Sequence, residues 1–120
     1  METLSENTNP TSEDYTTLQP KEFAKAIKQP DIFLIDVRHP DEYETGHLSG
    51  ATNIDVLDPD FLTKAKSILP KDKTIAVYCG TGKRSAMASE QLSSNGYHII
   101  NLAGGLQAWN ATFPSAQSAA

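Results

Sequence analysis

A short loop around one cysteine carries the residue types that could do chemistry in this chain. Cys79 is followed by Gly80, Thr81, Gly82, Lys83, Arg84 and Ser85. Two glycines permit backbone angles that other residues resist, so consecutive N–H groups can turn inward and bind an anion. Two cationic side chains stand at the end of the loop. The pattern predicts a thiolate nucleophile at Cys79, with residues 80–84 holding an anionic substrate or leaving group beside it.

Cys79 is the only cysteine of the chain, which excludes an intramolecular disulfide and a cysteine-rich metal site. Two interpretations remain, because a free cysteine is commonly a buried, inert residue but can also be a reactive thiol. Residues 74–78 have the composition of a buried strand, and a helix is expected from about residue 84 to 95. The positive N-terminal end of that helix would face the cysteine, so we favour the reactive thiol.

The rest of the chain alternates apolar, β-branched runs with helical patterns. Strands are expected at residues 32–37, 74–78 and 97–102. Further helix starts are indicated at Pro20, Pro40, Asp58–Asp60 and Gly104. This alternation predicts an α/β fold with a mostly parallel sheet of about five strands and helices on both faces. Cys79 would stand at the carboxyl end of a strand, where such sheets bind ligands.

Length and composition are consistent with one domain. The 120 residues allow a modest core, and we expect the domain to span residues 17–113. Residues 1–16 are polar and aperiodic, so we expect a disordered segment there, and residues 114–120 are expected to form a frayed tail. The N-terminus has no basic start or apolar run, which favours a cytoplasmic protein.

The charge of the chain limits its partners. The formal net charge is −5, so we expect binding neither to nucleic acid nor to an anionic membrane surface. No stretch approaches the roughly 20 apolar residues of a membrane helix. An anionic substrate would therefore be captured by a local site that works against the overall charge of the protein.

Four segments together resemble the rhodanese family, over about residues 17–109. The cysteine loop matches that family's Cys-x-x-Gly-x-Arg pattern, which alone would be weak evidence. Residues 34–38 are similar to its strand ending in Asp-x-Arg. Residues 42–54 match Glu-x-x-x-Gly-His-x-x-Gly-Ala-x-Asn-Ile, and residues 101–109 contain Gly-Gly-x-x-x-Trp. Four matches in the right order make the resemblance specific.

The resemblance implies the rhodanese fold and the activity of a single-domain thiosulfate sulfurtransferase. Cys79 would take the outer sulfur of thiosulfate or of a persulfide donor and pass it to cyanide, a thiol or a sulfur-carrier protein. No metal and no organic cofactor is required. Many family members carry a basic residue directly after the cysteine. Gly80 takes that place here, so the mouth of the site carries less positive charge, and Lys83 is the residue that could compensate.

Three residues are expected to support the site: Asp36, Arg38 and Ser85. Asp36 ends a buried strand and Arg38 follows two positions later, near the cysteine loop in this fold. We favour a structural ion pair that braces the loops over a direct role in chemistry. His47 invites a general-base interpretation. Because an ionised thiolate needs no base, a structural histidine bonded to the backbone is favoured instead.

Two other functions are compatible with parts of the pattern. A cysteine phosphatase or arsenate reductase of related fold has five residues between cysteine and arginine. Here four residues separate Cys79 from Arg84, and no aspartate is a strong candidate for a general acid. A non-catalytic binding or regulatory module is the second alternative, although the intact cysteine loop favours chemistry. A relay that receives sulfur from a partner enzyme lies between these possibilities.

Overall fold

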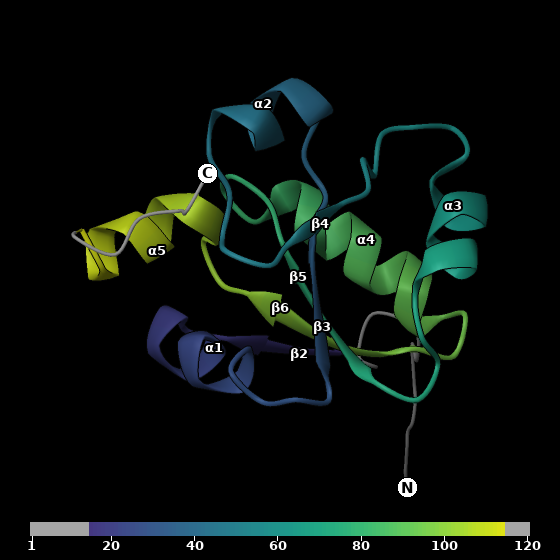
Figure 1. The fold of residues 1–120 in the computed structure, drawn as a ribbon, viewed down its shortest axis with the longest axis horizontal. Helices are drawn as coiled ribbons and strands as arrows, with labels where there is room; N and C mark the ends of the chain where they lie inside the picture. Colours follow the sequence, from purple (N-terminus) through teal and green to yellow (C-terminus); the bar gives the residue numbers. More distant parts are fainter. Residues whose placement is uncertain (1–14, 115–120) are drawn as a thin grey trace, which may run out of the picture.

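The computed structural model describes residues 15–114, which form a five-stranded sheet with helices on both faces (Figure 1). All neighbouring strands are parallel, in the order β2-β6-β5-β3-β4. The strands are β2 (Tyr15–Leu18), β3 (Ile32–Asp36), β4 (Thr52–Asn53), β5 (Thr74–Tyr78) and β6 (His98–Leu102). The helices are α1 (Pro20–Ala26), α2 (Pro40–Thr45), α3 (Phe61–Ile68), α4 (Lys83–Ser93) and α5 (Gly105–Thr112). The predicted α/β class is confirmed.

Helices cover both faces of the sheet, with α1 and α5 on one side and α3 and α4 on the other (Figure 1). Phe61 of α3 and Leu92 of α4 pack against one face. Phe23 of α1 and Trp109 of α5 pack against the opposite face, with their rings edge to face. The central strands are therefore buried on both sides, which explains their continuous apolar sequence. The longest described helix, α4, has 11 residues, and no helix within residues 15–114 has the length and apolarity of a membrane span.

The two edge strands are not evident in the sequence. β2 includes Tyr15 and Thr16, so the predicted disordered segment 1–16 is wrong at these two positions. Its two central residues are exposed, and β2 therefore lacks the apolar run that marks a buried strand. Pairing with β6, in the register Tyr15↔Ile99, stabilises β2 as a strand although its own sequence does not indicate one. Residues 1–14, and the expected tail apart from Pro114, lie outside the described residues.

The carboxyl ends of β3 and β5 bring the cysteine loop beside the segment after β3. Asp36, the last residue of β3, is in register with Tyr78, the last residue of β5. The amide of Val37 then donates to the carbonyl oxygen of Tyr78. Cys79 follows β5 directly, at the carboxyl end of this central strand. The fold thus places the cysteine where the sequence predicts a ligand site.

The start of α5 packs directly on the cysteine loop. The amides of Leu106 and Gln107 donate to the carbonyl oxygens of Cys79 and Gly80, at 2.9 and 3.0 Å. Gly105 has a φ of 61°, and a Cβ at this residue would lie 2.5 Å from the Cys79 carbonyl oxygen. A side chain is therefore excluded by contact as well as by backbone conformation. This close approach fixes the carbonyl groups of Cys79 and Gly80 against the start of α5.

Alanine substitutions at Gly105 and at Gly50 separate the cost of the backbone conformation from the cost of the contact with the cysteine loop. Gly50 also has a positive φ, 86°, but a Cβ there would meet nothing within 4 Å. We expect Gly50→Ala to lower the free energy of unfolding by about 1–2 kcal/mol, the strain of the left-handed backbone. Gly105→Ala should cost about 1–3 kcal/mol more because of overpacking. Urea unfolding of both variants measures the difference, and equal losses would contradict the contact with the loop.

Candidate active site

The sulfur of Cys79 is buried and accepts two backbone hydrogen bonds. The residue is 1% exposed. The amide of Gly82 lies 3.0 Å from Sγ and that of Ser85 lies 3.2 Å from it. The thiol of Cys79 donates to the Ser85 hydroxyl oxygen at 3.5 Å, and this hydroxyl donates to the Gly82 carbonyl at 3.3 Å. The backbone around Cys79 thus directs two hydrogen-bond donors at the sulfur.

The loop after Cys79 leads into α4 through a residue with a left-handed backbone conformation, which glycine adopts more readily than other residues. Gly82 has a φ of 106° and directly precedes the helix. α4 begins at Lys83, one residue before the predicted start. The amides of Thr81, Lys83 and Arg84 have no acceptor within residues 15–114. Together with the positive end of the helix, these amides form a surface suited to an anion.

Arg84 already has a partner in the structure. Its Nη1 and Nη2 donate to the two carboxylate oxygens of Glu42, at 2.7 and 3.1 Å. These hydrogen bonds lower the pKa of Glu42 to about 2, while the carboxylate raises the pKa of Arg84. The pair joins the start of α4 to α2. Arg84 thus lies at the loop as predicted, but its charge is compensated.

Glu42 is the site residue that sequence reasoning missed. It opens the segment 42–54 that matches the family pattern, so its type and place were available as a signal. Its partner lies 42 positions later, and local sequence does not indicate the pairing. The amide of His39 also donates to the Glu42 carboxylate, at 3.1 Å, and fixes it at the start of α2. Glu42 therefore belongs to the site through Arg84.

The other predicted loop residues are open to solvent or partly so. Lys83 and Thr81 are exposed, and neither forms a side-chain hydrogen bond or ion pair within the described part of the chain. Gly80 is partly buried, because Arg84 Nη2 lies 3.5 Å from the point that a Cβ on Gly80 would occupy. The guanidinium group therefore crosses over Gly80. Of the two predicted cations, one is paired and the other extends into solvent.

Asp36 and Arg38 form the expected ion pair. Arg38 Nη2 lies 2.7 Å from Asp36 Oδ2, and the Arg38 amide and Nε each lie 3.0 Å from Oδ1. Although burial opposes it, the hydrogen bonds and charge of Asp36 raise the pKa of Arg38. Nη2 also donates to the carbonyl of Gly46 at 2.7 Å. The pair ties the end of β3 to the end of α2, and no hydrogen bond joins it to Cys79 among the described residues.

His47 is held by the backbone, as predicted. Its Nδ1 lies 2.8 Å from the carbonyl oxygen of Tyr43, and its ring stacks on the Tyr43 ring at 3.7 Å between centroids. The Tyr43 hydroxyl in turn donates to the Ala51 carbonyl at 2.6 Å. These contacts anchor α2 and hence the carboxylate of Glu42. His47 has no hydrogen bond to the cysteine loop within residues 15–114.

The comparisons with known proteins agree with this arrangement. A model of the rhodanese-like domain matches residues 19–112. The chain belongs to the rhodanese-like domain family. It is 38% identical over 94 residues to the uncharacterized protein YqhL of Bacillus subtilis, covering 78% of this chain and 71% of that protein. It is 34% identical over 117 residues to Protein HIGH ARSENIC CONTENT 1, mitochondrial, of Arabidopsis thaliana, covering 88% and 69% of the two chains.

Solved structures show the same fold. A rhodanese-related protein from Thermoplasma volcanium superposes with a TM-score of 0.72 at 33% identity. The match covers 82% of this chain and 94% of that one. The rhodanese fold inferred from the four sequence segments is confirmed by this similarity.

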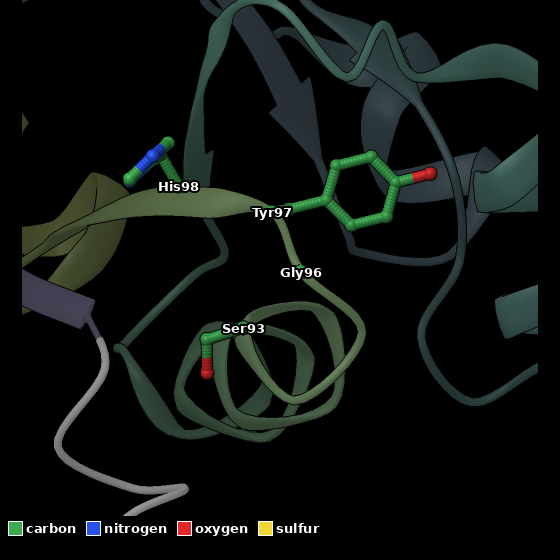
Figure 2. A pocket seen from close by; sticks show the side chains of 4 residues that line it. All are labelled: Ser93, Gly96, Tyr97 and His98. Carbon is green, nitrogen blue, oxygen red and sulfur yellow. The ribbon is translucent and has the colours of Figure 1, made fainter.

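A surface hollow of this rhodanese-like domain lies away from Cys79. It has a volume of about 270 Å³ and is lined by Ser93, Gly96, Tyr97 and His98 (Figure 2). These residues form the turn from α4 into β6, at the amino end of that strand. Cys79 follows the carboxyl end of β5, the edge at which parallel sheets bind ligands. The hollow is therefore separate from the candidate active site.

The Glu42–Arg84 pair makes stability depend on pH. The pKa of Glu42 is lowered from 4.5 to about 2 in the folded state. The ion pair therefore stabilises the folded state above pH 4.5, the ordinary pKa of Glu42, and this stabilisation is lost as the pH falls toward 2. Because the Glu42 side chain is 38% exposed, screening limits the contribution to roughly 1 kcal/mol or less. We expect Glu42→Gln to be less stable than wild type at neutral pH.

Urea unfolding between neutral and strongly acidic pH measures this difference. The gap between wild type and Glu42→Gln should close as pH falls through the range from 4.5 to about 2. Glu44→Gln is the matched control, since Glu44 is exposed on the same helix. A gap that stays constant down to the lowest pH would contradict the charge interaction.

Proposed function

We propose that this rhodanese-like domain moves sulfane sulfur from a donor to a thiophilic acceptor through a persulfide on Cys79. The observation that carries the proposal is the pair of backbone amides, of Gly82 and Ser85, on a buried cysteine sulfur. A buried charge is costly unless hydrogen bonds compensate it. A fold that supplies two donors to one sulfur is suited to a thiolate nucleophile.

The first half-reaction loads the cysteine. The Cys79 thiolate attacks the outer sulfur of thiosulfate or of a thiol persulfide. The sulfur–sulfur bond of the donor breaks, and its electron pair leaves with sulfite or with the donor thiolate. In the second half-reaction an acceptor such as cyanide, a thiol or a sulfur-carrier protein attacks the terminal sulfur. Cys79 leaves as the thiolate, so no external oxidant or reductant enters the cycle.

The loop amides would stabilise the loaded state. The terminal sulfur of the persulfide is anionic, and it would extend from Cys79 toward the amides of Thr81, Lys83 and Arg84, which have no acceptor within residues 15–114. Fixed donors of this kind stabilise charge without reorganising. The Ser85 hydroxyl could turn from the Gly82 carbonyl to Sγ when the thiolate is regenerated. Asp36 and Arg38 would act only by bracing the adjacent loop.

The less favoured alternative, a cysteine phosphatase or arsenate reductase, would need an arginine free to bind phosphate oxygens. Arg84 instead gives both terminal nitrogens to Glu42. A single anionic sulfur can be held by the backbone amides alone, whereas a phosphoryl group presents three oxygens and more charge. The pairing of Arg84 therefore supports sulfur transfer over phosphate hydrolysis.

Intact-protein mass spectrometry without reductant tests the proposal. After incubation with thiosulfate or with a thiol persulfide, the chain should gain roughly 32 Da, the mass of one sulfur atom. Cyanide should remove this mass, and Cys79→Ser should not acquire it. An adduct from the persulfide alone would assign the domain to a sulfur relay. No adduct from either donor would contradict the proposal and favour a non-catalytic binding module.

The contribution of Ser85 can be separated from simple packing. We expect Ser85→Ala to slow cysteine loading roughly threefold to tenfold, because the Ser85 hydroxyl, 3.5 Å from Sγ, is then no longer there to donate to the attacking thiolate. Ser89→Ala is the control, since Ser89 is also buried on α4 and its hydroxyl has no partner in the described structure. Stopped-flow measurement of single-turnover loading compares the two variants. Equal rates for both would remove the Ser85 hydroxyl from the mechanism.

A further inference from the structure

We propose that Glu42 sets the donor preference of this site: by neutralising Arg84 it disfavours dianionic thiosulfate relative to sulfur donors that carry less charge. The inference rests on the proposed sulfur transfer at Cys79 and names the class of donor that the site selects. Thiol persulfides without strongly anionic groups are donors of this class. Glu42 is a specificity-determining residue that acts through Arg84.

The charges around the cysteine loop give the first argument. The positive charge of Arg84 is held by both oxygens of Glu42. A second carboxylate, that of Asp55, also acts on Arg84 and raises its pKa, after the larger effect of Glu42. Lys83 is exposed and carries its charge into solvent, where screening weakens it. A dianion approaching the Cys79 thiolate would therefore meet a compensated cation and the carboxylate of Glu42.

The position of the guanidinium group gives the second argument. Arg84 Nη2 lies 3.5 Å from the point where Gly80 would carry a Cβ. A Cβ at residue 80 would be in ordinary van der Waals contact with the guanidinium group. The guanidinium group thus lies beside Gly80 and is directed at Glu42 on α2. Bidentate pairing also fixes the plane of the group, so Arg84 is not free to rotate toward a donor.

The anchoring of Glu42 gives the third argument. The carboxylate accepts from the His39 amide as well as from Arg84, and His39 itself contacts Asp55 at 2.6 Å. The carboxylate is therefore fixed at the start of α2. A surface ion pair between two mobile side chains would open readily for an incoming anion. This pair is held on both sides, so a donor has to bind while Glu42 remains in place.

Two donors that differ by one charge test the inference. Thiosulfate and methanethiosulfonate both carry a sulfane sulfur on a sulfonyl group, but a methyl group replaces one oxygen in the second. Cys79 attacks the sulfane sulfur of either, and the bond pair leaves with sulfite or with methanesulfinate. Both leave the same persulfide on Cys79. Steady-state assays with cyanide as acceptor then give kcat and KM for each donor.

We expect Glu42→Gln to raise kcat/KM for thiosulfate roughly tenfold more than for methanethiosulfonate, since one charge is removed near the donor. The change should lie mostly in KM. Glu44→Gln removes a charge from the exposed side of the same helix and should change the donor ratio less than about twofold because of screening. Glu42→Asp retains the charge and should keep the donor ratio of wild type even if both rates fall.

The outcomes separate this inference from the proposed function. If Glu42→Gln alters both donors equally or alters neither, Glu42 does not set the preference, although Cys79 still transfers sulfur. If Glu42→Asp shifts the donor ratio as Glu42→Gln does, the shape of the side chain acts rather than its charge, and the inference is wrong. If no donor loads Cys79 in wild type or in any variant, the proposed function itself fails.

Discussion

The hydrogen bonds from two backbone amides to the sulfur of Cys79 are the interaction on which the rest of the site depends. A charged sulfur at this position, which is 1% exposed, would lose most of its hydration, and this loss is severe unless donors replace the water. Gly82 and Ser85 supply them at 3.0 and 3.2 Å. They can do so only because the chain reverses at Gly82 and enters α4 at once. The loop conformation is thus a requirement of the chemistry that we propose.

Several elements hold that conformation from outside the loop. β5 delivers the cysteine to the edge of the sheet, and α5 fixes the carbonyl groups of Cys79 and Gly80 through its first amides. That contact requires Gly105 to have no side chain. On the other side, Arg84 ties the start of α4 to α2. The amides that face the sulfur are therefore positioned by backbone contacts with α5 and by the side-chain pair of Arg84 and Glu42.

Apart from Lys83, which extends into solvent, the charged groups of the site form closed pairs. Asp36 and Arg38 are both buried and satisfy each other, with a further bond from Arg38 to the Gly46 carbonyl. Glu42 and Arg84 form a second pair. Such pairs add little net stability but fix the loops after β3 and β5 relative to each other. The backbone amides then become the principal donors left for an anion, which suits one sulfur atom better than a multiply charged group.

Local signals made much of this fold predictable. The buried strands β3 and β5 have continuous apolar sequence, and Pro40 and Gly46 mark both ends of α2. The edge strand β2 was missed, because its stability comes from pairing with β6 rather than from its own residues. The place of Cys79 directly after β5 was also predictable, and the start of α4 was predictable to within one residue, since both follow from local sequence.

The partner of Arg84 and the need for Gly105 were not predictable. Both arise from contacts between segments far apart in the sequence. A glycine pair at a helix start is compatible with many structures. Only the fold shows that Gly105 lies against the carbonyl of Cys79. In the same way, an acidic residue in the first turn of a short helix is common, and only the fold shows that Glu42 pairs with Arg84 of α4.

The crystal structure of the chain after loading with a sulfur donor tests the central claim most directly. The account predicts a second sulfur bonded to Cys79 Sγ, within hydrogen-bond distance of the amides of Thr81, Lys83 or Arg84, with Arg84 still bound to Glu42. A terminal sulfur directed away from these amides, or a loaded state in which the loop has opened, would contradict it.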